Sequence, residues 1–364
     1  MMFRPLAAFI TIFSILVAFL LLFSAAVIGA VVYFNAPPGA EPRANIHDPW
    51  LKVENSHSVV LEVRSGESAR SVGNRLEEAG LIRSRYFWDL LARYRKEYIK
   101  TGTYRLELPV SSVRLYSLLV SGKQLLLRVT IPEGSTRKKT ARILEEAGIC
   151  SAPDFLAASE DKGFIESLHI SAETLEGYLY PDTYLFPPDY PVRLVIKAMT
   201  DTFFSRLESM YPAVFELSPE EIRRKLILAS IVEREYRVDE EAPLMAGIFF
   251  NRLEIGMALQ SCATVEYVIT EIQGRPHPEV LYTRDTEIRN PYNTYIRPGL
   301  PPGPISSPGA VALKAVFEPE SSGYLYFRLL DPATGRHYFS RTLDDHIRAG
   351  ALYVKSSPEG RPRS

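Results

Sequence analysis

The sequence has few cysteines and no excess of charge. Its 364 residues include two cysteines, Cys150 and Cys262, which cannot form a disulfide framework. The six histidines are scattered, and no group of His and Cys has the spacing of a metal site, so we expect no metal site. The formal net charge is −1. A protein whose main task is to bind nucleic acid needs a basic surface, so this function class is excluded as well.

The sequence also lacks the compositional bias of disordered, fibrous or multi-span membrane proteins. Of its residues, 46% are hydrophobic and 23% are charged, which is ordinary for a folded soluble protein. At roughly 150 residues per domain, the length predicts two or three domains, each able to bury a core.

One long apolar run differs from the rest of the chain. Residues 7–34 contain no charged side chain, and about 20 apolar residues suffice to cross a bilayer. Arg4 and the terminal amine precede the run. The positive-inside rule therefore predicts that residues 1–6 are cytoplasmic and that the chain after Phe34 lies outside. A cleaved signal peptide has an apolar region of only about 7–15 residues, so we expect an uncleaved, single-pass membrane helix.

An internal repeat follows a linker. Residues 35–56 are rich in proline and predict that linker. Beyond it, the string Leu-Glu-Glu-Ala-Gly occurs twice, ending at Gly80 and at Gly148. Each copy is preceded by an alternating strand pattern, a glycine turn and a helix pattern, and glycine suits the left-handed position after a helix. We predict two small α+β modules of one design, over residues 57–126 and 127–170.

The pattern of residues 171–356 is mainly helical. Ser218-Pro-Glu-Glu is a capping box with Pro at the first helical position, and it predicts a helix that runs to about Tyr236. Two more helices are expected over residues 240–254 and 256–272. We therefore predict a mainly helical α+β domain.

Residues 290–309 differ from their helical surroundings because they are rich in proline and glycine. A rigid, tyrosine-bearing loop of this length favours a wall of a functional site over an exposed connector. The last residues, 357–364, predict a tail.

Glu233 is a candidate acid catalyst in the predicted helix. At 100° per residue it shares a face with Ile222, Leu226 and Ala229. A carboxyl group on an apolar face is desolvated, which raises its pKa and lets it hold the proton that a general acid needs. These residues alone leave open a salt bridge to a neighbouring arginine. They also leave Glu235 as a competitor, although its face carries Arg224 as a partner.

Carboxylates and tyrosines occur together in the segment LEGYLYPDTYLF, residues 175–186. Aromatic rings pack on the C–H faces of sugars while carboxylates and phenols bond hydroxyl groups, so the segment fits a sugar site. A packed β-segment with tyrosine tips at the surface explains it equally well. In this segment and beyond it, the candidate substrate-binding residues are Glu176, Tyr180, Asp182, Asn251, Gln260, Tyr292, Asn293 and Tyr295.

Several strings together resemble the endolytic murein transglycosylase family (MltG, or YceG-like) in order and spacing. They are LEGYLYPDTYLF, LASIVERE, IFFNRLEIGMALQS, NPYNTY, GLPPGPISSPG and HYFSRT. The resemblance covers nearly the whole chain and implies an N-terminal transmembrane helix, two LysM-like modules and a catalytic domain over residues 171–356. The catalytic glutamate of the family is the first Glu of the string ASIVE, which is Glu233 here; this disfavours Glu235.

The resemblance also implies a function. A member of this family is a bacterial cytoplasmic-membrane protein whose catalytic domain lies on the extracytoplasmic side. It cleaves nascent peptidoglycan strands at the MurNAc-β-1,4-GlcNAc bond, leaves a 1,6-anhydro-MurNAc end and so terminates strand elongation. The expected partners are peptidoglycan strands, the membrane and peptidoglycan synthases, and the chemistry requires no cofactor.

One departure from the family pattern concerns the residues after Gln260. Many members have Asp-Pro where this chain has Cys262 and Ala263. If that aspartate contacts substrate elsewhere in the family, the contact is lost or changed here, so Cys262 is not among the site residues. We expect no disulfide between Cys150 and Cys262.

Three other functions are alternatives to this one. A penicillin-binding acyltransferase has S-x-x-K, S-x-N and K-T-G in that order, whereas here Ser135 to Lys138 follows Lys100 to Gly102 and no S-x-N lies between them. A hydrolytic glycosidase is also compatible with the chemistry of the candidate residues. So is a membrane-anchored scaffold that binds peptidoglycan without cleaving it.

Overall fold

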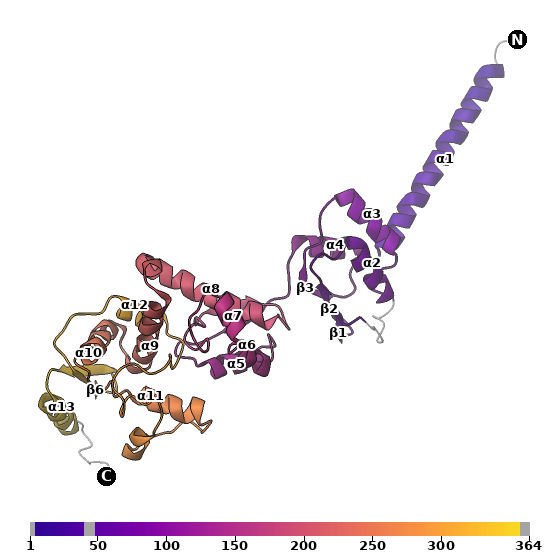
Figure 1. Cartoon of the computed structure of the whole chain (residues 1–364). Helices are drawn as coiled ribbons and strands as arrows, with labels where there is room; N and C mark the ends of the chain where they lie inside the picture. Colours follow the sequence, from indigo (N-terminus) through magenta and orange to yellow (C-terminus); the bar gives the residue numbers. More distant parts are fainter. Residues whose placement is uncertain (1–3, 40–47, 357–364) are drawn as a thin grey trace. The chain divides into compact units, whose positions relative to one another are not determined.

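The computed structural model describes residues 4–39 and 48–356, and it divides into two compact units, residues 1–126 and 127–364 (Figure 1). The first unit begins with helix α1 (Arg4–Asn35). Its segment Phe9–Asn35 is long and apolar enough to cross a membrane, with a mean hydropathy of 2.9, and none of its most apolar window is buried. This helix is consistent with the predicted membrane anchor.

The rest of the first unit is a small α+β fold with its own core. Three antiparallel strands pair in the order β1-β2-β3. The strands are β1 (Leu51–Asn55), β2 (Ser58–Val63) and β3 (Gly102–Glu107), and the helices are α2 (Ala69–Glu78), α3 (Arg85–Arg95) and α4 (Ser112–Ser121). Strand β1 lies within the segment expected to be a linker, of which residues 40–47 are outside the described part of the chain.

The second unit opens with the second copy of the repeat. Strands β4 and β5 pair antiparallel, with Val129 opposite Tyr184. The elements are β4 (Leu127–Thr130), α5 (Arg137–Glu146), α6 (Ala152–Ala158), α7 (Lys162–Ser167) and β5 (Thr183–Phe186). The predicted strand, glycine turn and helix are present in both copies, and Gly80 and Gly148 are left-handed with φ of 71° and 72°. Because β5 lies beyond residue 170, the division of the chain there stays a prediction.

Helices form most of the remaining chain. They begin with α8 (Val192–Met210), η1 (Pro212–Glu216), α9 (Pro219–Glu235), η2 (Asp239–Glu241) and α10 (Ala242–Glu254). The capping box is confirmed, because Ser218 Oγ accepts from Glu221 N while the Glu221 carboxylate accepts from Ser218 N. Helix α9 packs against α10 and α12 (Figure 1).

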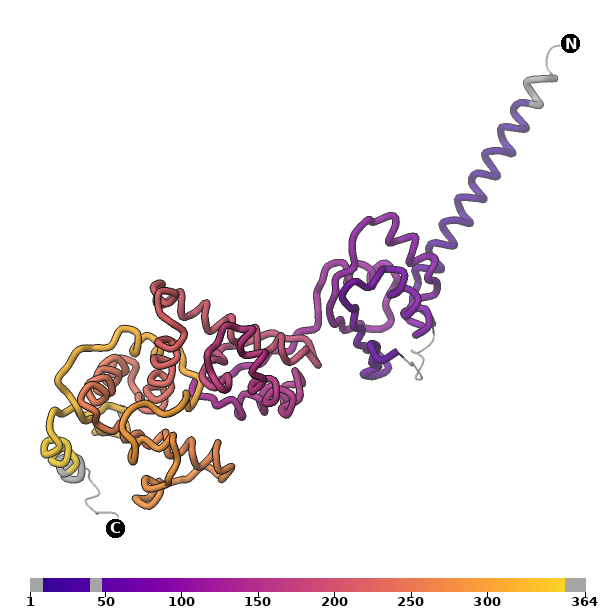
Figure 2. Tube along the Cα trace, viewed as in Figure 1, coloured from indigo at the N-terminus to yellow at the C-terminus, as the bar shows by residue number. Residues whose placement is uncertain are grey.

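After α10 the chain forms short helical turns and a long irregular segment before the helix α12. The elements are α11 (Cys262–Tyr267), the π-turn η3 (Val268–Ile272), η4 (Thr283–Glu287), α12 (Ala310–Phe317), β6 (Tyr326–Asp331), β7 (Arg336–Ser340) and α13 (Leu343–Ser356). Figure 2 shows the long excursion between η3 and α12. Residues 290–309 form no helix or named strand, as predicted.

The helix predicted over residues 256–272 begins later than expected, at Cys262. Gln260 is left-handed with φ of 52° and Ser261 is extended, so the chain cannot be helical before Cys262. Tertiary contacts fix this conformation: Gln260 N donates to Thr294 O and Ser261 N donates to Thr294 Oγ1, both at 3.1 Å. The periodicity of the sequence could not show these contacts.

One hydrophobic core runs through the second unit. It includes Val129 and Ala141 from the second repeat, Ile231 from α9 and Phe317 from α12. The second repeat and the helices therefore form one folded body, whereas the first unit buries a separate cluster around Trp88 and Tyr116.

Candidate active site

Helix α9 places Glu233 near its C-terminal end. The residues predicted to share its face, Ile222, Leu226 and Ala229, are buried. One turn earlier, Ser230 fixes the neighbouring loop: Ser230 Oγ accepts a hydrogen bond from Ile305 N at 3.0 Å, and Ser230 O accepts one from Ser306 Oγ at 3.1 Å. The loop therefore follows α9 and brings Gly309, which precedes α12, to the Glu233 carboxyl group.

The half-buried Glu233 carboxyl group is bound at one oxygen. Its Oε2 accepts a hydrogen bond from Gly309 N at 2.9 Å. Burial raises the pKa of Glu233 to about 7, the Gly309 N–H opposes this rise, and the nearby Glu133 carboxylate adds to it. The negative end of the α9 dipole acts in the same direction as burial. A carboxyl group that titrates near neutrality can donate a proton and take it back.

The turn at Glu133 and Gly134 forms another side of this site. Gly134 N donates to Ser307 O at 2.9 Å, which holds the turn against the loop before α12. A Cβ atom at Gly134 would lie 3.7 Å from Glu233 Cγ, and one at Gly309 would lie 1.9 Å from Glu133 Oε1. Two carboxyl groups, those of Glu133 and Glu233, therefore flank the backbone of Gly309.

Glu233 faces a cleft of about 900 Å³ in the second unit. This volume is within the range typical of ligand sites. The walls come from the second repeat, the end of α9 and the chain that follows η3. The lining residues are Glu133, Gly134, Thr136, Lys138, Lys139, Arg142, Ala152, Leu156, Glu233, Arg234, Thr270, Glu271, Gly274, Arg275, Pro276 and His277.

Cations line the wall that α5 contributes to the cleft. Lys138, Lys139 and Arg142 are exposed there, and Lys138 Nζ donates to Glu271 O at 2.5 Å. Among the described residues, Lys139 and Arg142 have no carboxylate within ion-pair distance. Lysines in the first turn of a helix oppose its dipole, and like charges four residues apart repel each other. These three cations therefore destabilise α5. Their presence is better explained by binding of an anionic partner than by a role in folding.

The first repeat provides an internal comparison for these cations. Its helix α2 carries Arg70, Ser71 and Asn74 at the equivalent positions. Arg70 is paired with Asp89 at 3.1 Å. The two cations without a carboxylate partner, Lys139 and Arg142, are therefore a property of the second repeat and not of the shared design.

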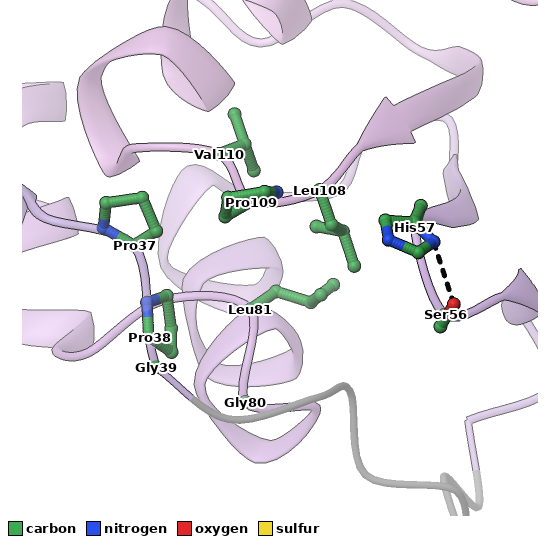
Figure 3. Close-up of a pocket in the computed structure, with 10 residues that line it drawn as sticks. All are labelled: Pro37, Pro38, Gly39, Ser56, His57, Gly80, Leu81, Leu108, Pro109 and Val110. Atoms are coloured by element: carbon green, nitrogen blue, oxygen red, sulfur yellow. Dashed lines mark hydrogen bonds between the residues drawn. The ribbon is translucent and has the colours of Figure 1, made fainter.

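A smaller pocket lies in the first unit (Figure 3). Its volume is about 260 Å³, below the range typical of ligand sites. The hydrogen bond between Ser56 Oγ and His57 Nδ1, at 2.8 Å, is the one drawn there, and none of the described residues that line the pocket carries a carboxyl group (Figure 3). The cleft at Glu233 contains a carboxyl group with a raised pKa and is therefore the candidate active site.

Glu235, the competing acid, lies in different surroundings. Its Oε1 accepts a hydrogen bond from Ser261 Oγ. Burial raises the pKa of Glu235 to about 7 as well, but Glu235 does not line the cleft. Among the residues that the structure describes, no three His, Cys, Asp or Glu side chains form a group that could hold a metal ion.

Three of the predicted substrate contacts are Glu176, Tyr180 and Asp182, and each is buried or paired within the fold. Glu176 is 4% exposed, and its Oε1 accepts from Arg137 N at 2.9 Å, at the start of α5. Tyr180 is 6% exposed. Asp182 is half-buried and paired with Arg206 at 3.0 Å. None of the three lines the cleft.

Four of the other five candidates lie in the loop before α12 or bond to it, whereas Asn251 bonds the chain that follows α12. Asn251 Nδ2 donates to the carbonyls of Ser322 and Tyr324, and the buried Asn293 bonds the carbonyls of Thr286 and Ile288. The rest are the exposed Gln260, the half-buried Tyr292, and Tyr295, whose hydroxyl lies 3.0 Å from Cys262 Sγ. The structure groups Gln260 and Tyr295 near Cys262, and none of the five lines the cleft. Cys150 and Cys262 are free thiols.

Sequence reasoning missed Glu133 and the cations of α5. The signal that could have found them is the difference between the two repeats. Ser65 occupies the position in the first copy that Glu133 has in the second, and both precede the glycine of the turn. A position that carries charge in only one copy does not serve the common fold.

Comparisons with known proteins agree with each other. The model of the YceG-like family matches residues 61–351. The endolytic murein transglycosylase of Bacillus subtilis strain 168 is 28% identical over 326 residues, which cover 85% of this chain and 88% of that protein. The endolytic murein transglycosylase of Streptococcus pneumoniae R6 is 30% identical over 330 residues, 82% of this chain and 59% of that protein. The crystal structure of a yceG-like protein from Listeria monocytogenes aligns with a TM-score of 0.54 and 29% identity, covering 80% of this chain and 98% of that one.

Proposed function

The chain belongs to the YceG-like family, and on that premise we propose that it is a lytic transglycosylase that cleaves the glycan strands of peptidoglycan at an internal position. The observation that carries the proposal is the placement of Glu233, a carboxyl group with a pKa raised to about 7, at a cleft of about 900 Å³. Burial keeps the Glu233 carboxyl group protonated near neutral pH, so that it can act as an acid. The cleft has room for more than one sugar.

In the proposed reaction, protonated Glu233 donates its proton to the oxygen of the MurNAc-β-1,4-GlcNAc bond. The C1–O bond breaks, and the muramyl ring takes up positive charge. The Glu233 carboxylate then removes the proton of the C6 hydroxyl group of the same sugar, whose oxygen bonds to C1. The product is a 1,6-anhydro-MurNAc end, and Glu233 is protonated again. The nucleophile belongs to the substrate, so no water is consumed.

The other residues of the cleft have supporting roles in this proposal. Glu133, beside Gly309, stabilises the positive charge on the muramyl ring. Glu176 and Asp182 position the walls through Arg137 and Arg206. Gln260, Tyr292 and Tyr295 would contact more distant sugars of the strand, whereas Asn251 and Asn293 hold loops through backbone carbonyls.

The proposal extends to the whole chain. Helix α1 anchors it in the bacterial cytoplasmic membrane, and the chain after α1 lies on the extracytoplasmic side, where peptidoglycan is made. The two repeats are LysM-like modules that hold glycan, and nascent strands beside peptidoglycan synthases are the substrate. The strand–helix–helix–strand order of β2, α2, α3 and β3 supports the assignment of the first module.

The Glu233→Gln substitution tests the catalytic role. Loss of a general acid costs about 10²–10⁴-fold in rate, so we expect the variant to fold and bind strands while the anhydro product falls by at least that factor. Mass spectrometry of the digest measures the product. The matched control is Glu254→Gln, an exposed residue outside the cleft, which should keep full activity. A fully active Glu233→Gln variant would refute the assignment.

A hydrolytic glycosidase is a second candidate because a second carboxyl group, Glu133, lies across Gly309 from Glu233. Such enzymes use a pair of carboxyl groups. Hydrolysis adds one water to the product and leaves a reducing end, whereas the proposed reaction leaves an anhydro end of lower mass. The same mass spectrum separates the two, and binding without any cleavage would indicate a scaffold.

A further inference from the structure

Helix α3 of the first unit carries an exposed apolar stripe. Tyr86, Leu90 and Tyr94 are spaced four residues apart and therefore share a face. They are 71%, 59% and 84% exposed, and Tyr98, just after the helix, is 90% exposed. The opposite face is already buried, with Trp88 in the core cluster and Leu91 and Ala92 packed against it. The stripe is thus a second apolar face that the described fold leaves uncovered.

Cations accompany this stripe. Residues 93–100 contain Arg93, Arg95, Lys96 and Lys100, against Glu97 alone. In the described chain, no carboxylate lies within ion-pair distance of Arg93 or Lys96, and both are exposed. Tyrosine together with lysine and arginine is the composition found where a protein meets lipid headgroups.

The end of the anchor is fixed beside this face. Phe34 stacks on Phe87 of α3 at 6.5 Å between ring centroids, and its carbonyl accepts a hydrogen bond from Ser112 Oγ at 3.2 Å. The Arg83 guanidinium lies 4.6 Å from the Tyr33 ring centroid, and its Nη2 donates to Pro37 O at 2.9 Å. Figure 1 shows α3 beside the end of α1. Within the described residues, the end of the apolar helix therefore packs directly against α3 and the start of α4.

We propose that the exposed stripe of α3, with Tyr98 and the neighbouring cations, lies in the headgroup layer of the membrane that α1 spans and binds its anionic lipids. This inference rests on the proposed anchor. Three observations favour lipid as the occupant: the stripe adjoins the point where the chain leaves the apolar helix, its rings are tyrosines, and its charge is positive. The first unit is then held against the bilayer at two places, α1 and α3.

Tryptophan fluorescence in the full chain tests this placement. The chain is reconstituted in phosphatidylcholine vesicles with brominated acyl chains, with and without phosphatidylglycerol, and each variant is compared with the unsubstituted protein to remove the signal of Trp50 and Trp88. Phe19→Trp in α1 reports insertion, Tyr94→Trp reports the stripe, and Val53→Trp on β1, 42% exposed, is the matched control in the same unit.

We expect strong quenching at Phe19→Trp and quenching at Tyr94→Trp at least roughly threefold that of Val53→Trp, increasing when phosphatidylglycerol is present. Equal quenching of Tyr94→Trp and Val53→Trp, with Phe19→Trp quenched, overturns the inference and leaves the anchor intact. An unquenched Phe19→Trp overturns the anchor and this inference with it, while cleavage by the second unit is measured separately.

Discussion

At the scale of single residues, three glutamates share a raised pKa but differ in surroundings. Burial raises the pKa of Glu176, Glu233 and Glu235 to about 7 in each case. Only Glu233 lines the cleft; the other two are hydrogen-bonded within the fold. A raised pKa therefore reports burial, and the position of the carboxyl group distinguishes a catalyst from a structural acid.

The first prediction concerns the pH dependence of cleavage. The reaction needs protonated Glu233, whose pKa is about 7. Below that value the acid is protonated and kcat/KM is high; above it the protonated fraction falls tenfold per pH unit, and kcat/KM falls with it. Initial rates on soluble strands between pH 5 and 9 measure this decrease of kcat/KM, the falling limb of the pH profile.

Glu133→Gln sharpens this test. The Glu133 carboxylate raises the pKa of Glu233, so its removal should move the falling limb to lower pH, whereas Glu254→Gln should leave the limb in place. An unchanged limb in Glu133→Gln would show that another group controls the profile.

The second prediction concerns Glu176 and stability. Its folded-state pKa is about 7, above the ordinary 4.5. Below pH 4.5 both states are protonated; as the pH rises from 4.5 towards 7 the unfolded state loses its proton first, so the free energy of unfolding falls by about 3 kcal/mol. Glu176→Gln should remove this part of the pH dependence in urea unfolding measured at pH 5 and 8. Equal pH dependence in both proteins would contradict the assignment.

The residue types of the site could be predicted only in part. Glu233 was found because its apolar face is local information within one helix. Glu133 was missed because it meets Gly309 only through the fold, far away in sequence. Asn251 and Asn293 were predicted as sugar contacts, but their amides satisfy backbone carbonyls of other segments, and no sequence pattern distinguishes these two uses of an amide.

At the scale of elements, helix α5 provides the third prediction. Lys139→Ser with Arg142→Asn gives α5 the residues that α2 has at these positions, so folding should be preserved. We expect KM for peptide-bearing strands to rise roughly tenfold and to depend less on salt, because two cations of the cleft are lost. The matched control is Lys314→Ser with Arg224→Asn, both exposed and outside the cleft. An equal rise in the control would assign the effect to net charge.

Helix boundaries were predictable where the chain itself supplies the hydrogen bonds. Ser218 and Glu221 cap α9 from within four residues, so its start was predicted correctly. The start of α11 depends on Thr294, which holds Gln260 and Ser261 in non-helical conformations. Strand β5 lies in the segment 175–186, for which a packed β-segment was one of two interpretations, but its partner β4 could not be predicted because the repeat pattern separates the two strands.

At the scale of the whole molecule, two separate cores share one chain. The cluster around Trp88 belongs to the first unit, and the core from Val129 to Phe317 belongs to the second. Two walls of the cleft, the second repeat and the end of α9, are built on the second core, so the second repeat cannot unfold without loss of the site. The fourth prediction follows from this arrangement.

Differential scanning calorimetry should record two endotherms, and enzyme assays on heated samples should lose activity with only one of them. Leu144→Ala, in the second core, should lower the temperature of that endotherm and of inactivation together, whereas Leu76→Ala, its counterpart in the first core, should move the other endotherm alone. A single endotherm that shifts in both variants would contradict independent melting. The second repeat and α9 share the second core, so the fold fixes the distance between these two walls of the cleft. A glycan strand must therefore fit a width that exists before it binds.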